Sequence, residues 1–321
     1  MEYRKVTVIG DGAVGSTIAY TLFMKNYLNE ICIIDINKDK VIGDVLDMNQ
    51  GMSFVSTKKI KVGEYKDIKD SDLVIITAGA AQKEGETRLD LLEKNINIFK
   101  KILDEIKLNL SERTIILVVT NPVDLLSYFT YKYLNITPNR VIGSGTVLDS
   151  SRLKVLLSDD TKIDPKNIHA YVIGEHGDSE VVAFSASSIA GIKVKDYCKQ
   201  CAKCDIKKLE NLEEITKTVK NAAYEIIKKK GATYYAIGLS VEKIVDVILN
   251  DTHSVLTVSS YIESAFNDQI KDIYLSFPCV VGRKGIERRL EVNYSLDEGI
   301  KLIASAQKLK ETYNKVIKTN S

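Results

Sequence analysis

Short apolar runs alternate with amphipathic segments along the first half of the 321-residue chain. The runs are rich in Val and Ile, which favour strands, and their consecutive apolar positions suit a parallel sheet that is buried on both faces. The segments between them repeat apolar residues at helical spacing. We predict strands at residues 5–10, 30–35, 72–78, 114–120 and 140–143, and helices at 16–26 and 39–48. This alternation predicts an α/β fold with a doubly wound parallel sheet, which binds ligands at the carboxyl ends of its strands.

The regular alternation ends near residue 144, so we predict one domain at 1–143 and a second at 144–321. No Pro/Gly-rich linker separates them, and we expect them to be tightly joined. The second domain is predicted to be α+β, with a strand at 168–174, helices at 213–229 and 234–249, antiparallel strands at 254–262 and 272–291, and a C-terminal helix.

Two of the predicted helices have a periodic apolar face that we expect to be buried. In the helix at 39–48 this face consists of Val41, Ile42, Val45 and Leu46. The C-terminal helix begins with the capping-box pattern Ser295-Leu-Asp-Glu298. Its predicted apolar face includes Ile300, Ile303 and Ala304.

The composition is that of an ordinary globular protein, with 45% hydrophobic and 27% charged residues and a net charge of +2. The lysines are spread along the chain, which argues against a nucleic-acid surface. No apolar run approaches the ~20 residues that span a bilayer. The first residues lead into a strand without a signal-peptide pattern, so we expect a cytoplasmic protein.

The five cysteines are expected to be reduced thiols, because their number is odd and no signal sequence precedes them. Cys198, Cys201 and Cys204 form a C-x-x-C-x-x-C run, a spacing that is found in parts of metal and iron–sulfur sites. No histidine or proline stands nearby to complete a familiar pattern. We therefore predict no metal and interpret the run as a lysine-rich surface segment.

A glycine-rich turn, Gly10-Asp-Gly-Ala-Val-Gly15, follows the first predicted strand and leads into a helix. Asp35 ends the next strand, 20 residues after Gly15. This combination is the fingerprint of a dinucleotide-binding Rossmann domain. Gly12 lets a pyrophosphate approach the backbone at the start of the helix. Asp35 is suited to bind the adenosine ribose and repels a 2′-phosphate, so we predict NAD rather than NADP as the cofactor.

His176 follows a predicted strand, within the sequence Gly174-Glu-His-Gly-Asp178. Glycines close to it keep bulk away from the ring, and an imidazole is suited to transfer a proton near pH 7. The alternative is a histidine in a polar turn. Asp149 and Arg152 would share one face of a helix that begins near Asp149. They form either a capping ion pair or a functional pair, in which Arg152 binds a substrate carboxylate and Asp149 stabilises an imidazole.

Two more polar residues lie beyond strand ends. Arg88 follows a small-residue, charged loop that begins at Gly79, and this composition is typical of a mobile lid. Arg88 either polarises a carbonyl when the lid closes or is solvated at a helix start. Asn121 precedes Pro122, and the pair suits a helix start with Asn121 as N-cap and Pro122 at the first helical position. A residue at this strand end also stands where a cofactor or substrate would lie.

Five motifs in this order resemble those of the lactate and malate dehydrogenase family: GDGAVGS at 10–16, TNPVD at 120–124, VLDSSRL at 147–153, GEHGDSE at 174–180 and GATYYAIG at 231–238. The resemblance covers nearly the whole chain. It implies a Rossmann domain, a mixed catalytic domain and NAD-linked hydride transfer at a 2-hydroxy acid. It also implies roles for four side chains: His176 as proton acceptor, Asp149 as its stabiliser, Arg152 as the carboxylate ligand and Arg88 as the group that polarises the carbonyl.

The same resemblance implies the remaining binding residues. Asn121 bonds the reacting oxygen, and Thr233 and Ile237 line the substrate and nicotinamide pocket. The implied cofactor-binding residues are Gly10, Gly12, Ala13, Val14, Gly15, Asp35, Thr77, Ala78, Gly79, Asn121 and Ile237.

Gln82 is the expected substrate selector, because lactate-type members carry glutamine there and malate-type members carry arginine. A second substrate carboxylate opposite Gln82 would be buried without a cation. We therefore expect reversible reduction of pyruvate to (S)-lactate by NADH. The alternatives are a malate dehydrogenase, an L-2-hydroxyisocaproate dehydrogenase and, in another class, an NAD(H)-binding sensor on the same scaffold.

Regulation and assembly are also suggested by the resemblance. Allosteric bacterial members bind fructose 1,6-bisphosphate between subunits through a histidine and an arginine. His169 matches the histidine, whereas Lys154 stands at the place of the arginine. A lysine attracts phosphate but does not bind it in a bidentate manner. Activation therefore stays an open hypothesis, with a strand-flanking His169 and a solvated Lys154 as the alternative. The expected assembly is a homotetramer.

Overall fold

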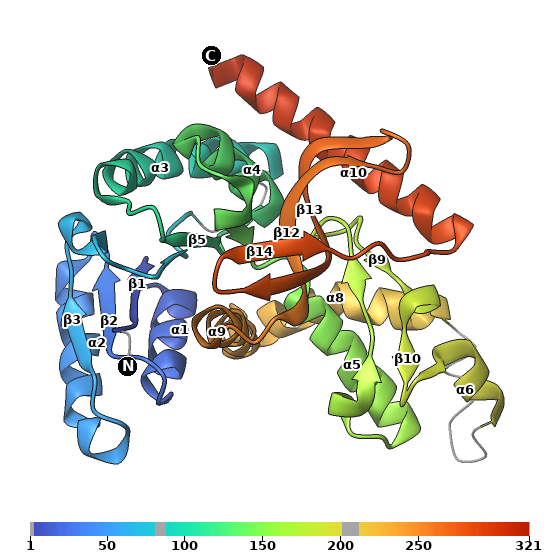
Figure 1. The fold of residues 1–321 in the computed structure, drawn as a ribbon, viewed down its shortest axis with the longest axis horizontal. Helices are drawn as coiled ribbons and strands as arrows, with labels where there is room; N and C mark the ends of the chain where they lie inside the picture. The colour runs from blue at the N-terminus through green and yellow to red at the C-terminus, as the bar shows by residue number, and fades with distance from the viewer. Residues whose placement is uncertain (1–2, 81–87, 201–211, 321) are drawn as a thin grey trace.

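The computed structural model describes residues 3–80, 88–200 and 212–320, and at 88–89, 198–200 and 317–320 it describes the backbone alone. One large sheet has the strand order β14-β13-β12-β6-β5-β4-β1-β2-β3 (Figure 1). Its strands are β1 (Lys5–Ile9), β2 (Glu30–Ile34), β3 (Lys59–Val62), β4 (Leu73–Ile76), β5 (Ile115–Val118), β6 (Val141–Gly143), β12 (Ser254–Ala265), β13 (Ile270–Gly282) and β14 (Gly285–Arg289).

The first six of these strands pair in parallel and the last three pair antiparallel. This confirms the predicted class, a doubly wound parallel sheet followed by antiparallel strands. Two features of the sheet were not predicted: the edge strand β3, and the pairing between the two halves of the chain. β12 pairs antiparallel with β6, with Ser259 opposite Gly143, so the second half of the chain extends the sheet of the first.

The helices cover both faces of this sheet. In Figure 1, α3 and α4 lie above the strands, while α1 and α9, which pack against each other, lie below them. The described α-helices are α1 (Ala13–Phe23), α2 (Lys38–Gln50), α3 (Arg88–Asn109), α4 (Val123–Leu134), α5 (Val147–Thr161), α6 (Val194–Gln200), α8 (Leu212–Lys230), α9 (Tyr235–Asn250) and α10 (Leu296–Asn320). None of them is long and apolar enough to cross a membrane.

The predicted strand at 168–174 is instead two short strands in different sheets. β7 (Ile168–His169) belongs to a three-stranded sheet with β10 (Ser188–Ile189) and β11 (Ile192–Lys193). β8 (Val172–Ile173) pairs with β9 (Val181–Val182). The prediction was wrong because an apolar run shows that a segment is buried but not which strand it pairs with.

Two predicted helix faces were partly wrong. In α2, Val41 and Val45 are buried as predicted, but Ile42 and Leu46 are 43% and 58% exposed. In α10, Ile300 is 59% exposed and Ala304 is also exposed, whereas the buried face consists of Leu302, Ser305, Ala306, Leu309, Tyr313 and Val316. Two adjacent apolar stripes have the same periodicity, so only packing decides which is buried. The capping box of α10 is present, since the backbone N–H of Ser295 donates to Glu298 Oε2 at 3.0 Å.

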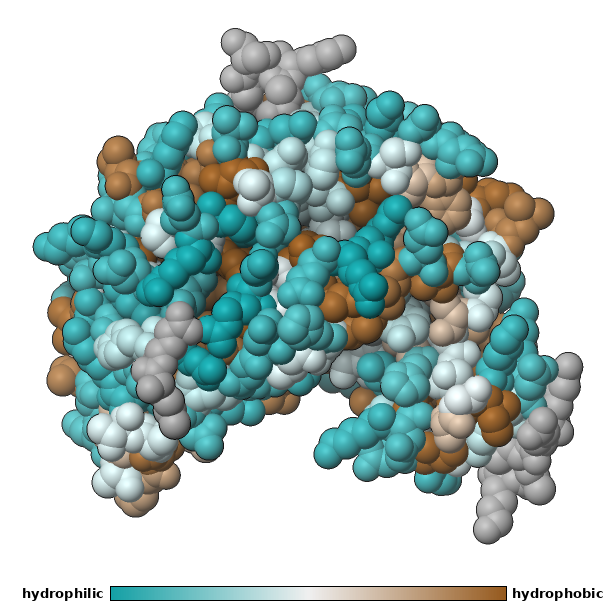
Figure 2. Space-filling model, viewed as in Figure 1, coloured by the Kyte–Doolittle hydropathy of each residue, from teal (hydrophilic) through white to brown (hydrophobic). Residues whose placement is uncertain are grey.

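The outer surface in this view is mostly hydrophilic, as Figure 2 shows. A notch hollows it between the part built on α1 and α2 and the part built on α5 and α6. Several large apolar side chains are nevertheless exposed on α1, its C-cap Met24, α2 and α9: Tyr20, Met24, Ile42, Leu46, Tyr235 and Leu239.

Candidate active site

Both halves of the chain hold the loop that carries His176, which runs from β8 to β9. At its start, Gly174 and Ser276 of β13 exchange backbone hydrogen bonds of 2.9 and 3.0 Å. The backbone N–H of His176 donates to Asp124 Oδ2 of α4 at 2.7 Å. Asp124 is buried, and its Oδ1 accepts a hydrogen bond of 2.6 Å from Ser259 of β12. The position of His176 is therefore fixed by α4 from the first half and by β12 and β13 from the second.

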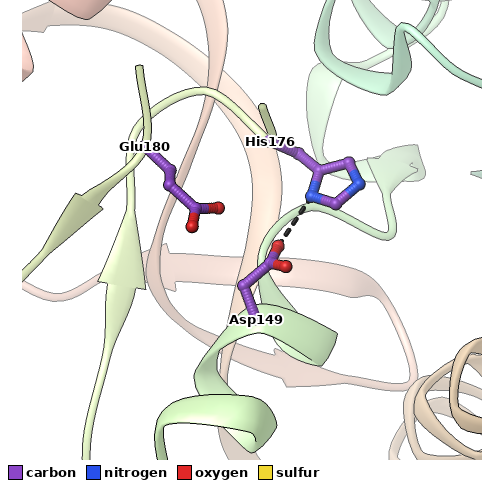
Figure 3. Close-up of side chains that lie close together, drawn as sticks. All are labelled: Asp149, His176 and Glu180. Atoms are coloured by element: carbon purple, nitrogen blue, oxygen red, sulfur yellow. Dashed lines mark hydrogen bonds and ion pairs between the residues drawn. The ribbon is translucent and has the colours of Figure 1, made fainter. Parts of the chain in front are cut away.

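The His176 ring forms a charged pair with Asp149. His176 Nδ1 lies 2.6 Å from Asp149 Oδ2 (Figure 3), and Arg152 Nη1 donates to Asp149 Oδ1, also at 2.6 Å. Asp149 stands in the first turn of α5, so the helix presents it and Arg152 on one face, as predicted. The Nδ1 bond leaves Nε2 as the nitrogen that can serve a substrate.

Burial and charge act in opposite directions on this pair. Burial alone would lower the pKa of His176, but the Asp149 carboxylate outweighs it and raises that pKa to about 9. Burial likewise opposes ionisation of Asp149, yet His176 and Arg152 hold the pKa of Asp149 below its usual value. The pair is therefore suited to store a proton on the imidazole at neutral pH.

A pocket of about 520 Å³ opens beside the ring. Four of the predicted site residues line it: Asn121, Asp149, Arg152 and His176. Helix α8 adds Lys220 and Tyr224, both of which hydrogen-bond to Asp178 at 3.0 Å. The remaining polar lining includes Glu175, Asp178, Glu180, Lys308, Thr312 and Lys315. A pocket with one guanidinium and one protonated imidazole suits a small anion.

Asn121 is not the N-cap of α4. Pro122 takes the N-cap position in extended backbone, and it forms no side-chain cap. Asn121 thus lies outside the helix and is exposed, with its side chain free of the capping role. Asn95 of α3 holds this turn, because its Nδ2 donates to the Asn121 carbonyl at 2.8 Å and its Oδ1 accepts from the backbone of Ala80 at 2.7 Å.

Most of the predicted cofactor-binding residues lie at the carboxyl ends of β1, β2 and β4, whereas Asn121 follows β5 and Ile237 lies in α9. Gly10 has a φ of +102°, and a Cβ there would lie 2.4 Å from the backbone nitrogen of Ala78. Thr77 Oγ1 donates to the Gly10 carbonyl at 2.8 Å. Asp35 Oδ2 accepts a hydrogen bond of 2.6 Å from the backbone of Asp11, which fixes the acid beside the glycine turn.

These residues fit a dinucleotide. The space around Gly12 is open, with no heavy atom within 4 Å of a Cβ built there, so a phosphate can approach the first turn of α1. The Asp35 carboxylate is half-exposed and held by two backbone N–H groups, those of Asp11 and Asn37. Such a carboxylate keeps acceptor capacity for ribose hydroxyls.

Some predicted site residues lie outside the described part of the chain or away from the pocket. Gln82, Cys201 and Cys204 lie outside the described residues, as do the side chains of Cys198 and of Arg88, the first residue of α3. Thr233 precedes α9 and Ile237 belongs to its first turn, but among the described residues neither lines the pocket. Gly238 approaches Thr17 of α1 closely, which places this end of α9 beside the cofactor half.

Several site residues were missed by the sequence analysis. Asp124 and Asn95 hold the backbone of His176 and Asn121, Ser259 holds the Asp124 side chain, and Glu180 lines the pocket. Asp124 sits in the TNPVD motif, but an acid in the first turn of a helix is also common for its dipole alone. Glu180 ends the GEHGDSE motif, but an acid in a polar loop has no evident role without the fold. Ser259 and Asn95 had no distinguishing pattern.

The fold and the site together define the class of protein. A family model described as lactate/malate dehydrogenase, NAD binding domain, matches residues 4–143. A second, described as lactate/malate dehydrogenase, alpha/beta C-terminal domain, matches residues 146–320. The chain belongs to the lactate/malate dehydrogenase family. It is an NAD-dependent oxidoreductase.

Particular relatives are similar over almost their whole length. The chain is 51% identical to the L-lactate dehydrogenase of Acetivibrio thermocellus over 316 residues, which cover 98% of this chain and 97% of that protein. It is 48% identical to the L-lactate dehydrogenase of Clostridium botulinum over 317 residues, which cover 97% of this chain and 96% of that protein. Among solved structures, a lactate dehydrogenase from a Medee basin deep-sea metagenome library matches with a TM-score of 0.93 and 38% identity, covering 98% of this chain and 99% of that one. The minor L-lactate dehydrogenase of Enterococcus mundtii matches with a TM-score of 0.91 and 36% identity, over 98% of both chains.

Proposed function

We propose that this chain is an L-lactate dehydrogenase, which reduces pyruvate reversibly to (S)-lactate. The observation that carries the proposal is the His176–Asp149 hydrogen bond of 2.6 Å, beside Arg152 in one pocket. An acid–base group and a carboxylate ligand are the two functions that a small 2-oxo acid requires. The curated relatives at 51% and 48% identity are named L-lactate dehydrogenases.

In reduction, the protonated His176 donates the Nε2 proton to the carbonyl oxygen of pyruvate, and in oxidation the neutral ring takes the hydroxyl proton back. Asp149 stabilises the charged ring in both directions. Arg152 binds the substrate carboxylate and so aligns the carbonyl with His176. Asn121 and Arg88 complete the site as hydrogen-bond donors to the reacting oxygen. The hydride chemistry is supplied by NAD when it is bound, held by the first turn of α1 (Gly12, Ala13, Val14) and by Asp35.

NADH oxidation tests this function directly. We expect a strong preference for pyruvate over oxaloacetate, and turnover of either substrate would argue against the alternative of an NAD(H)-binding sensor. Preference for oxaloacetate would favour a malate dehydrogenase. Preference for a 2-oxo acid with a bulky side chain would favour an L-2-hydroxyisocaproate dehydrogenase.

The role of His176 has its own test, the variant His176→Ala. One general acid–base group contributes roughly 10²–10⁴-fold to the rate. We expect kcat for pyruvate reduction to fall by at least about 10²-fold, while NADH binding persists. His253→Ala, at an exposed histidine of the second half, is the matched control. Turnover near that of the unmodified enzyme would remove His176 from the mechanism.

The assembly that we propose is a cytoplasmic homotetramer. Exposed apolar side chains of α1, α2 and α9 support a subunit contact there, because isolated proteins rarely expose large contiguous apolar surfaces.

Activation by fructose 1,6-bisphosphate would involve Lys154 and His169. His169 is exposed on β7, and Lys154 is half-buried on α5, which packs beside that strand. A lower apparent KM for pyruvate in the presence of the bisphosphate, lost in His169→Ala, would support this site.

A further inference from the structure

The pocket contains a buried carboxyl group that has no part in the mechanism above. Glu180 immediately precedes β9, and the residue is only 4% exposed. Figure 3 shows its carboxyl group pointing toward Asp149 and His176. One ligand atom from each of these three residues lies within 4.8 Å of the others. Among the described residues, Glu180 Oε1 has no hydrogen-bond partner.

Such a group needs an explanation, because a buried carboxylate oxygen without a hydrogen-bond partner is costly. A metal ion does not provide one. Asp149 Oδ1 is bonded to Arg152 and Oδ2 to His176 Nδ1, both at 2.6 Å, so an ion would have to displace an intact pair. A neutral carboxylic acid provides a better explanation, because burying it costs far less than burying a charge.

We propose, on the basis of the function above, that Glu180 is an uncharged carboxylic acid in the working enzyme. As a positioning residue, the neutral Glu180 spares the substrate carboxylate from a nearby negative charge. When Glu180 is ionised, its charge raises the proton affinity of His176. Two charged groups of α5, Asp149 and Arg152, face it, together with His176 in its own loop and Lys220 of α8. Burial raises the pKa of Glu180 to about 8, and the Asp149 charge acts in the same direction. His176, Lys220 and Arg152 oppose this rise without cancelling it.

The charge balance of the site indicates why a neutral Glu180 would favour substrate binding. With Glu180 neutral, the protonated His176, Arg152, Lys220 and the Asp149 carboxylate together carry two positive charges, which favour a substrate with one carboxylate. Ionisation of Glu180 removes one of these charges and places a negative charge in the pocket. It also raises the proton affinity of His176, since a negative charge nearby favours the imidazolium. Glu180 therefore has to be neutral for substrate binding, while its charge, when present, holds the proton on the ring.

The test compares pH profiles of kcat/KM in the unmodified enzyme and in Glu180→Gln, whose amide stays neutral at every pH. In pyruvate reduction both Glu180 and His176 must be protonated, so we expect two protons to be lost on the alkaline side and log kcat/KM to fall with a slope near two. In Glu180→Gln only His176 titrates, and the slope should be near one. At a pH where Glu180 is ionised, the KM for lactate should be lower in Glu180→Gln, on the order of tenfold for one unit charge in a shared pocket.

Glu225→Gln is the matched control, because Glu225 is a 68% exposed glutamate of α8. It should leave both the slope and the KM unchanged. A slope near one in the unmodified enzyme, or a slope near two in Glu180→Gln, would overturn the proposal. A purely structural role for Glu180 would lower the rate without changing the slope.

Proton NMR of the imidazole ring separates this proposal from the proposed function, since it needs no turnover. The chain has only three histidines, so His176 can be assigned by comparison with His176→Ala. We expect its pKa to be lower in Glu180→Gln than in the unmodified enzyme. An unchanged pKa would overturn the proposal even in an active dehydrogenase, and a lowered one would support it even if no 2-oxo acid were reduced. If Glu180→Gln failed to fold, the infrared C=O band of a protonated carboxylic acid in the unmodified enzyme, lost as pH rises through about 8, would decide instead.

Discussion

At the scale of single residues, the site depends on how burial and charge compete at His176. A buried imidazole without a partner would be neutral at pH 7, and Asp149 is the group that reverses this. The raised pKa also has a consequence for folding. Its contribution to stability is complete below the unfolded pKa of about 6.5 and is lost as pH rises through about 9.

Asp149→Asn should remove the charge that raises the pKa of His176. Without the carboxylate, burial is opposed only by weaker charges, so the pKa of His176 falls and the ring loses its proton at a lower pH. We therefore expect the His176 step on the alkaline side of pyruvate reduction, near pH 9 in the unmodified enzyme, to move to lower pH, with a reduced rate at pH 7. A kcat/KM profile for pyruvate measures the shift. Asp159→Asn, at an exposed acid of the same helix, should leave this step in place.

Gln82→Arg should redirect substrate choice. Arginine supplies the cation that a second substrate carboxylate needs, so the ratio of kcat/KM for oxaloacetate to that for pyruvate should rise by at least about tenfold. The measurement is NADH oxidation with both acids. An unchanged ratio would show that Gln82 is not the selector.

The sequence predicted His176, Asp149 and Arg152 as one group because each stands in a recognisable motif, and the structure brings the three together. It did not predict the function of Asp124, whose role depends on contacts with β12 and with the His176 backbone. It was wrong about Asn121 as an N-cap, because the Asn-Pro pair fits a helix start equally well one residue later.

At the scale of elements, most strands of the parallel sheet followed from the apolar runs, whereas β3, the two short strands at 168–173 and the orientation of the helices did not. Val, Ile and Leu runs are buried wherever they lie in a parallel sheet, so such a strand can be predicted without knowing which strands it pairs with. A helix, in contrast, can have more than one apolar stripe that could face the core. In α2 the stripe of Val41 and Val45 turns inward while Ile42 and Leu46, one position later, face outward. Only the surfaces that α2 contacts determine this choice.

The turn between β1 and α1 gives a prediction with an internal control. A Cβ on Gly15 would lie 1.8 Å from the Gly10 carbonyl oxygen, whereas one on Gly12 meets no atom within 4 Å. Gly15→Ala should therefore destabilise the fold by at least ~1–3 kcal/mol, as overpacking does. Gly12→Ala should change stability by less than about 1 kcal/mol but weaken NADH binding, because the methyl group occupies the approach to the helix start.

Thermal unfolding and NADH fluorescence titration distinguish these two variants. The expected pattern is a lowered Tm with Gly15→Ala, and a nearly unchanged Tm with an increased Kd for NADH with Gly12→Ala. Equal effects of both variants on Tm would contradict the assignment of Gly12 to the cofactor.

At the scale of the whole molecule, the exposed apolar side chains of α1, α2 and α9 predict association. Leu239 is 60% exposed, near Tyr20 and Tyr235 at the rim of one shallow groove. Leu239→Lys should weaken the contact and yield smaller species in multi-angle light scattering. Leu108→Lys, at an 80% exposed leucine of α3, is the control and should keep the native mass. A native mass for both would place the subunit contact elsewhere.

Because β6 pairs with β12, we expect the half that carries the cofactor site to be unstable alone. A chain cut after residue 143 would expose β6 as an edge strand, with a row of unpaired N–H and C=O groups that can recruit another chain. The same cut would uncover apolar side chains such as Tyr128 of α4, whose ring now lies 6.3 Å from that of Tyr274 on β13. We therefore expect the second half to protect the first from aggregation, in addition to contributing residues to the pocket. Any design that borrows the NAD-binding half alone would have to cover this edge first.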